Sequence, residues 1–160
     1  GVGGGLQFVS YADIVLACSY ASFLDRPVSI GQVSAYETVG LARRMPFGAV
    51  MRMALLGRHE RITATRAHEL GMVSQVVDPP GSLEDAAQAL ADRIAGNSPA
   101  AARVSKRALW GALETGLTDA CRSGARDLAA MWGHPDQEEG PRAFAERRPA
   151  VWADEAKEKP

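Results

Sequence analysis

Three consecutive glycines, Gly3, Gly4 and Gly5, stand directly before a short segment of helical character. Because glycine has no side chain, a backbone built from it can approach a ligand closely. The first amides of the following helix, with the positive end of its dipole, favour a negatively charged atom. The arrangement suits an oxygen that becomes negative during a reaction, such as that of a thioester enolate. On glycine content alone, a plain flexible turn is the better explanation.

Other kinds of site are disfavoured by what the sequence lacks. A GxGxxG dinucleotide fingerprint would need glycine where Leu6 stands, and no Lys-Ser/Thr pair follows to make a P-loop. Cys18 and Cys121 lie far apart without a CxxC or Cys/His spacing, so neither a metal site nor a disulfide scaffold is expected. Reduced thiols are the rule in the cytoplasm, which is the expected location. The formal net charge of −1 gives no overall attraction for nucleic acid or an anionic membrane.

The composition predicts one globular domain of mixed secondary structure. Apolar residues make up 46% of the 160 residues and charged residues 23%, which is close to the average for such a domain. The apolar runs are shorter than the roughly 20 residues that a membrane-spanning helix needs. The first third is rich in glycine and β-branched residues, and the remainder is rich in alanine. This succession predicts an α/β fold with a helical appendage.

The elements that must position these residues can be placed from local patterns. Short apolar runs predict strands at 13–18, 21–24 and 72–77, and a short helix is expected at 6–12. Further helices are expected where a capping residue or proline precedes an apolar period, at Ser34, Pro46, Thr63, Ser82, Ser98, Thr118 and Asp136. Glu37 stands three residues after Ser34, which is a capping-box pattern.

Several segments in a fixed order resemble the crotonase (enoyl-CoA hydratase/isomerase) family. They are the triple glycine with its helix and the run Ala12-Asp13-Ile14, then Leu55–Ala64, Ala67–Val77, Ser98-Pro99 and 139–148. The resemblance covers residues 1 to about 152 and corresponds to the C-terminal portion of the family. It implies a crotonase-like ββα spiral core in 1–80, partial because its N-terminal part is absent. A helical trimerisation and CoA-capping region would follow in 81–152, and a charged tail in 153–160.

The resemblance implies roles for particular residues. The amide of Gly4 would supply one oxyanion-hole donor, and its partner would come from an earlier loop. The two glutamates that hydratases of the family use would fall at Gln7 and Pro27, so classical hydration is not expected. Glu37 falls about where dienoyl-CoA isomerases of the family place a catalytic aspartate, although it could merely complete the Ser34 capping box. Asp25 is the second candidate base, with a turn-forming aspartate as the alternative.

The expected binding residues extend the site along the substrate. Tyr36 would donate a hydrogen bond in the acyl pocket or simply be packed. In the family a basic residue and an aromatic near the C-terminus contact the CoA phosphates and adenine. Arg147 and Phe144 match them, and a salt-rich helix end is the alternative explanation for Arg147. The full set of substrate-binding candidates is Gly3, Gly4, Gly5, Gln7, Pro27, Tyr36, Phe144 and Arg147.

The resemblance therefore implies an acyl-CoA-processing enzyme that forms a thioester enolate, with isomerase-like proton transfer favoured over hydration. CoA would be part of the substrate, and no further cofactor is expected. The partners would be an acyl-CoA thioester and copies of the same chain, as a trimer or dimer of trimers. Residues 1–160 alone would be inactive without the second oxyanion donor. The alternatives are a catalytically silent acyl-CoA-binding or oligomer-forming member, and a thioester hydrolase or other lyase on the same fold.

Overall fold

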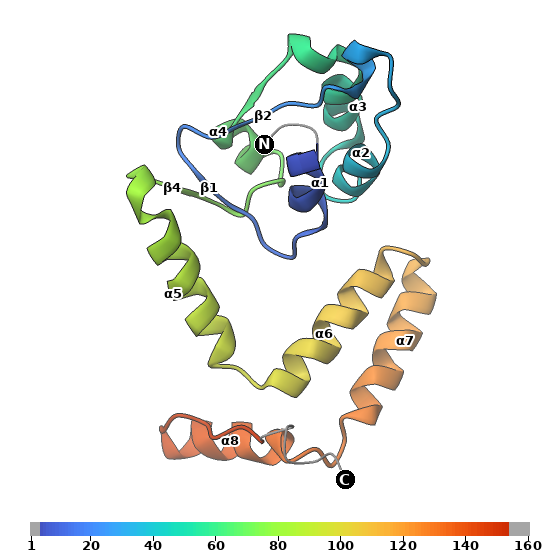
Figure 1. Ribbon diagram of the computed structural model, residues 1–160. Helices are drawn as coiled ribbons and strands as arrows, with labels where there is room; N and C mark the ends of the chain where they lie inside the picture. The colour runs from blue at the N-terminus through green and yellow to red at the C-terminus, as the bar shows by residue number, and fades with distance from the viewer. Residues whose placement is uncertain (1–3, 154–160) are drawn as a thin grey trace. The chain divides into compact units, whose positions relative to one another are not determined.

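The structure, a computed structural model, describes residues 4–153 and divides into two compact units between Ala89 and Leu90. Figure 1 shows the order of the elements. The first unit contains α1 (Gly4–Tyr11), β1 (Leu16–Cys18), β2 (Ser22–Phe23), η1 (Pro27–Ile30), α2 (Tyr36–Leu41), α3 (Phe47–Leu56), η2 (Gly57–His59), β3 (Ile62–Thr63), α4 (Ala64–Glu69), β4 (Gln75–Val77) and η3 (Pro80–Ser82). The helix α5 (Leu83–Ala95) crosses the division. The second unit contains α6 (Pro99–Ala112), α7 (Leu117–Ala130) and α8 (Asp136–Glu146).

The first unit is built on two short strand pairs. β1 pairs with β4 in parallel, with Ala17 opposite Val76, and β2 pairs with β3 antiparallel, with Phe23 opposite Ile62. The parallel pair joins segments far apart in sequence, as strands with a long helical crossover require. The core of this unit draws its residues from the helices and strands alike: Leu6, Val15, Ala17, Phe23, Leu41, Met53, Ile62, Ala67, Met72 and Val73.

The strands are shorter than the apolar runs that predicted them. The predicted strand 72–77 is paired only over Gln75–Val77. The amides of Met72 and Val73 both donate to the carbonyl oxygen of Ala67, at 2.9 and 3.2 Å, so this backbone closes α4 instead of joining the sheet. Both side chains are nevertheless buried. The apolar side chains of 72–77 are buried or half-buried, which explains the apolar run, but only Gln75–Val77 pairs with another strand.

Helix caps were predicted correctly where the cap is purely local. Thr63 accepts a hydrogen bond from the amide of Arg66 at 3.2 Å, and Ser98 accepts one from the amide of Ala101 at 3.1 Å. The predicted capping box at Ser34 is wrong. The cap of α2 is Ala35, with no side-chain hydrogen bond, and the Ser34 hydroxyl donates to Thr38 Oγ1 at 3.1 Å.

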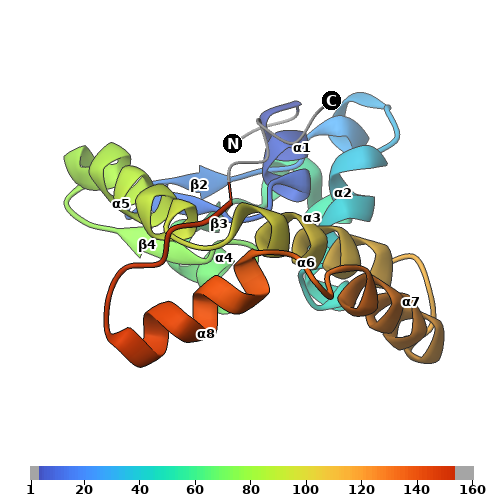
Figure 2. The same cartoon turned by 90° about the horizontal axis from the view of Figure 1, so that it is seen from below.

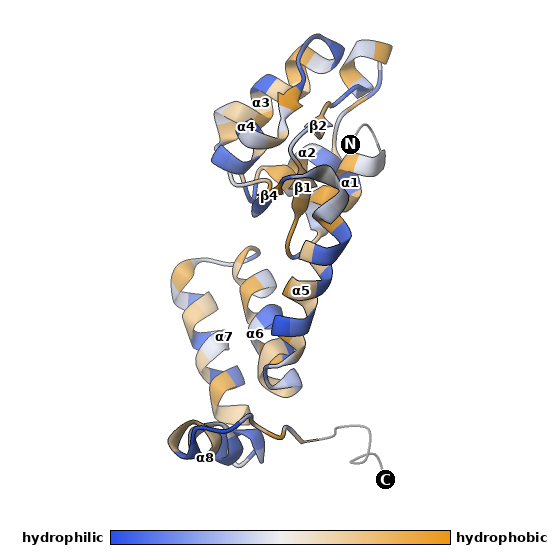
Figure 3. Ribbon diagram, turned by 90° about the vertical axis from the view of Figure 1, so that its left-hand side faces the viewer, coloured by the Kyte–Doolittle hydropathy of each residue, from blue (hydrophilic) through white to orange (hydrophobic). Residues whose placement is uncertain are grey.

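The second unit consists of helices. α6 and α7 lie side by side as an antiparallel pair, and polar and apolar residues alternate along both (Figures 1 and 3). α7 begins at Leu117, one residue before the predicted Thr118, and leaves large side chains such as Leu117 and Leu128 exposed. No helix within residues 4–153 is both long and apolar enough to cross a bilayer.

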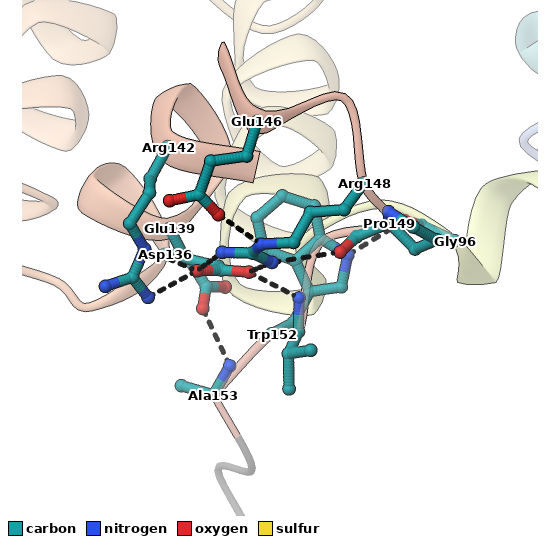
Figure 4. A network of polar contacts seen from close by, with 10 residues as sticks. Gly96, Asp136, Glu139, Arg142, Glu146, Arg148, Pro149, Trp152 and Ala153 are labelled. Carbon is teal, nitrogen blue, oxygen red and sulfur yellow. Dashed lines mark hydrogen bonds and ion pairs between the residues drawn. The ribbon is translucent and has the colours of Figure 1, made fainter. Parts of the chain in front are cut away.

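The segment after α8 is held by two buried carboxylates (Figure 4). Asp136 was predicted to cap α8. It is instead the first residue of that helix after the cap Pro135, and its carboxylate accepts from the hydroxyl of Ser98 and the amide of Ala153. Glu139 accepts from Arg148 and Arg142, each at 2.6 Å, and from the amide of Val151 at 2.7 Å.

Because of these hydrogen bonds to Glu139, we expect the melting temperature of the protein to depend on pH. Arg148 first, then the Val151 amide and Arg142, hold the pKa of Glu139 well below its ordinary value of 4.5. A carboxyl whose pKa is lower in the folded state stabilises the protein above its unfolded pKa and loses that contribution as pH falls. Glu139→Gln is therefore expected to lower the melting temperature at neutral pH, by a margin that narrows as pH falls below 4.5.

Thermal unfolding followed by circular dichroism across the acid range measures this margin. Glu138, the exposed neighbour on the same helix, provides the matched control, since Glu138→Gln should change the melting temperature little at any pH. If Glu139→Gln lowers the melting temperature equally at neutral and acid pH, the pKa of Glu139 is not lowered by its donors.

Candidate active site in the first unit

Gly4 and Gly5 open α1, and within residues 4–153 this start of the helix is exposed. A Cβ added to either glycine would meet no described atom within 4 Å. Leu6, completely buried, anchors the helix in the core. The first amides of a helix have no partner inside it, so those of α1 are available to a ligand oxygen. Gly3, the other predicted member, lies outside the described residues.

The helix α1 is held firmly against α2 (Figures 1 and 2). The Ser10 hydroxyl lies 2.9 Å from the carbonyl oxygen of Leu6 and 2.8 Å from that of Glu37, and donates between them. The Tyr11 hydroxyl donates to the carbonyl oxygen of Tyr36 at 3.1 Å. A Cβ on Gly40 would come within 2.8 Å of Ser10 Cβ, so the helices meet as closely as glycine permits. The glycine amides and Glu37, in the first turn of α2, therefore have fixed relative positions.

Asp25 is the second carboxyl group of this region. It lies between β2 and η1 with a relative exposure of 0%, and neither oxygen has a hydrogen bond of good geometry to residues 4–153. Burial raises the pKa of the Asp25 carboxyl, and the negative charge of Glu37 raises it further. The Ser34 hydroxyl and the backbone amide of Arg26 lie close enough to oppose this rise in pKa. Burial has the largest effect, so the pKa of Asp25 is raised overall.

An apolar groove of about 450 Å³ lies next to this group. Its walls come from η1, α2, α3 and the segment between η1 and α2. Ser34 and Thr38 are polar members of the lining. Ser34 thus both lines the groove and acts on Asp25. The lining comprises Val28, Gln32, Val33, Ser34, Thr38, Val39, Ala42, Phe47, Val50, Met51, Ala54 and Leu55.

The first unit thus contains an exposed helix start, two carboxyls of which Glu37 raises the pKa of Asp25, and an apolar groove. The sequence profile of the enoyl-CoA hydratase/isomerase family matches residues 1–155. The chain belongs to that family. A crystal structure of an enoyl-CoA hydratase/isomerase from Mycobacterium paratuberculosis superposes with a TM-score of 0.90 at 38% identity, over 95% of this chain and 60% of that one. The crotonase-like fold predicted from the sequence is thereby confirmed.

Two relatives show the range of names within the enoyl-CoA hydratase/isomerase family. The (E)-benzylidenesuccinyl-CoA hydratase of Thauera aromatica is 32% identical over 92% of this chain, and the mitochondrial enoyl-CoA hydratase of Pongo abelii is 30% identical over 96%. The chain spans 57% of the first relative and 52% of the second.

The remaining predicted residues of this family member lie at several places. Gln7 is exposed on α1, and Pro27 opens η1 and is half-buried. Tyr36 is 71% exposed, so the expectation that it is packed is wrong. Phe144 and Arg147 belong to the second unit, where Phe144 is 87% exposed and Arg147 ends α8 in a left-handed conformation with φ 53°.

Sequence reasoning missed the polar residues that join these parts. Ser34 was assigned as a cap and Thr38 was not singled out, yet their hydroxyls connect the groove to Asp25. The burial of Asp25 had one signal in the sequence, the apolar pair Phe23-Leu24 directly before it, which is typical of a segment that enters the core.

Proposed function

We propose that the chain is part of an enzyme that binds an acyl-CoA thioester and moves a proton through an enolate. The observation that carries this proposal is the exposed start of α1, held by direct hydrogen bonds against the helix that bears Glu37. An amide at a helix start stabilises an oxygen that gains negative charge. A carboxylate fixed in relation to it supplies the base that forming an enolate requires.

In the proposed reaction, the thioester oxygen accepts a hydrogen bond from the Gly4 amide. In a β,γ-unsaturated thioester, Glu37 takes a proton from the α-carbon, and the electron pair spreads over the oxygen and the γ-carbon. Glu37 then returns the proton to the γ-carbon, so the double bond moves from β,γ to α,β without loss or gain of atoms. The apolar groove, whose wall includes Ser34, would receive the acyl chain.

Isomerase-like transfer is proposed over hydration because the side chains for hydration are missing. Adding water across a double bond calls for one group that activates the water and another that protonates carbon. The family resemblance puts these groups at positions 7 and 27, and here they are Gln7 and Pro27. Neither side chain exchanges a proton at neutral pH. A single carboxylate such as Glu37 suffices for an isomerisation.

We also propose that the chain corresponds to the C-terminal part of such an enzyme and is inactive alone. In support, the chain spans only 57% of the Thauera aromatica relative's length. Phe144 and Arg147 would contact the adenine and phosphates of CoA. Homo-oligomers, as trimers or dimers of trimers, are supported by the exposed Leu109, Leu117 and Leu128 of the second unit. A cytoplasmic location and the absence of a further cofactor stay predictions.

The second candidate is a catalytically silent member that binds acyl-CoA or forms oligomers. Gln7 and Pro27 favour this alternative, because both positions lack a group that can carry a proton.

Deuterium exchange distinguishes the two candidates. The purified protein, in its full natural length, is incubated with a saturated acyl-CoA in heavy water, and the α-carbon is followed by proton NMR. Loss of the α-proton signal at a rate above the uncatalysed one is the expected result. Binding of the thioester without exchange would reject the enzyme in favour of the silent binder, and release of free CoA would indicate a hydrolase.

A further inference from the structure

Asp25 is a carboxyl group that the proposed proton transfer does not use. It is completely buried, and neither of its oxygens has a hydrogen-bond partner of good geometry within residues 4–153. An ionised carboxylate in such a place loses its hydration without compensation, so the group tends to keep its proton. The neighbouring charge of Glu37 acts in the same direction.

The hydroxyl groups beside Asp25 indicate which of its forms fits. Thr38 donates its hydrogen to the carbonyl oxygen of Ala35 at 3.3 Å, and Ser34 donates its hydrogen to Thr38 Oγ1 at 3.1 Å. A hydroxyl has a single hydrogen, so in this arrangement the oxygen of Ser34 can only accept a further hydrogen bond. A neutral Asp25 leaves the hydrogen of Ser34 with Thr38 and is therefore compatible with this arrangement. An ionised Asp25 would instead need the hydrogen that Ser34 gives to Thr38.

We propose that Asp25 is a positioning residue that keeps one proton beside Glu37, so that the two carboxyls together carry a single negative charge. This role rests on the proposed function, in which Glu37 is the base. Before the reaction Glu37 is ionised and Asp25 is neutral. While the enolate exists, Glu37 holds the substrate proton and the negative charge lies on the thioester oxygen. Asp25 neither gains nor loses a proton during the cycle, and being buried it acts through Ser34 and Glu37.

The charges around Asp25 are consistent with this role. Glu37, on α2, is the charged side chain that acts on Asp25. From Asp25's own segment, Arg26 contributes through its backbone amide, which opposes the rise in the pKa of Asp25. The Ser34 hydroxyl, from the segment before α2, opposes it as well. Removing this hydroxyl should therefore make Asp25 hold its proton more tightly.

The pH dependence of α-proton exchange tests the role in the reaction. Raising the pH ionises Asp25, which adds a second negative charge beside Glu37 and competes for the hydrogen of Ser34. The wild-type kcat/KM is therefore expected to fall on the alkaline side. Asp25→Asn should lose this alkaline fall, because asparagine has nearly the shape of the neutral acid and cannot ionise. An alkaline fall that is the same in both proteins would overturn the proposal.

Protein stability gives a test that does not depend on activity. A group whose folded pKa is raised contributes stability that is fully present below its unfolded pKa and is lost as pH rises through the folded pKa. For Asp25, whose ordinary pKa is 3.8, the loss begins above that value. The melting temperature of Asp25→Asn relative to wild type should thus increase as pH rises from acid to neutral. A difference that stays constant over this range would show that Asp25 does not retain its proton and would overturn the proposal.

Two further variants keep the tests decisive. Asp78→Asn is the matched control, because Asp78 is an exposed aspartate that accepts from the Ser19 hydroxyl at 2.7 Å, and its loss should leave the pH profile unchanged. If Asp25→Asn fails to fold, Ser34→Ala replaces it: the alkaline fall should move to higher pH, and an unmoved fall would overturn the proposal.

If the wild type shows no exchange, the proposed function fails and the positioning role with it. The stability profile then still decides whether Asp25 holds a proton.

Discussion

Replacing Glu37 with glutamine is expected to abolish α-proton exchange while the protein still binds the acyl-CoA thioester. Glutamine keeps the size of the side chain but cannot take a proton. Loss of a positioned general base typically lowers a rate by about 10²–10⁴-fold. The contacts of α2 with Ser10 and Tyr11 use backbone carbonyl oxygens at positions 37 and 36, so the substitution leaves them in place. Proton NMR in heavy water measures exchange, and calorimetric titration with the thioester measures binding.

The control for this prediction is Glu69→Gln. Glu69 is an exposed glutamate on α4 that pairs with Arg66 at 2.7 Å, and such surface pairs contribute little to stability. This variant should exchange protons at the wild-type rate. If Glu37→Gln also exchanges at that rate, Glu37 is not the base. If it loses binding together with exchange, its carboxylate acts on the ligand rather than on the proton.

The fold could be predicted where local pattern and tertiary context agree. The caps at Thr63 and Ser98 are satisfied by amides three residues further along, so their sequence neighbourhood contains the whole interaction. Ser34 has the same type of pattern, yet its hydroxyl donates to Thr38 instead. Ser34 lies beside the buried Asp25, and the capping pattern takes no account of such tertiary neighbours. The predicted cap at Ser34 is therefore wrong, because its surroundings depend on tertiary packing.

The candidate site could likewise be predicted only where local sequence patterns indicate its residues. Gly4 and Glu37 were singled out from motif order, and the structure fixes their helices against each other. The burial of Asp25 was not predicted, because the following Arg26 and Pro27 are typical of an exposed turn and conflict with the apolar pair Phe23-Leu24 before it. Its surroundings depend on the packing of α2 and the segment before it. The coupling of two carboxyls twelve residues apart is thus a property of the fold.

The amide of Gly4 can be removed with little disturbance of the helix that bears it. Proline lacks the amide hydrogen but is tolerated in the first turn of a helix. Gly4 is the first residue of α1. Gly4→Pro thus deletes the proposed donor, and its Cβ meets no described atom within 4 Å.

Gly4→Pro is expected to lower the kcat of α-proton exchange by about 10²–10³-fold, the usual effect of losing one oxyanion donor. Because the enolate oxygen carries more charge than the ground-state carbonyl, kcat should fall far more than thioester affinity. The matched control is Gly48→Pro, which makes the same change at an exposed position in the first turn of α3 where a Cβ also meets no described atom within 4 Å. The control should exchange at the wild-type rate, and both variants should keep the wild-type circular dichroism spectrum. A Gly4→Pro protein that folds and exchanges as fast as the control would show that this amide does not stabilise the enolate.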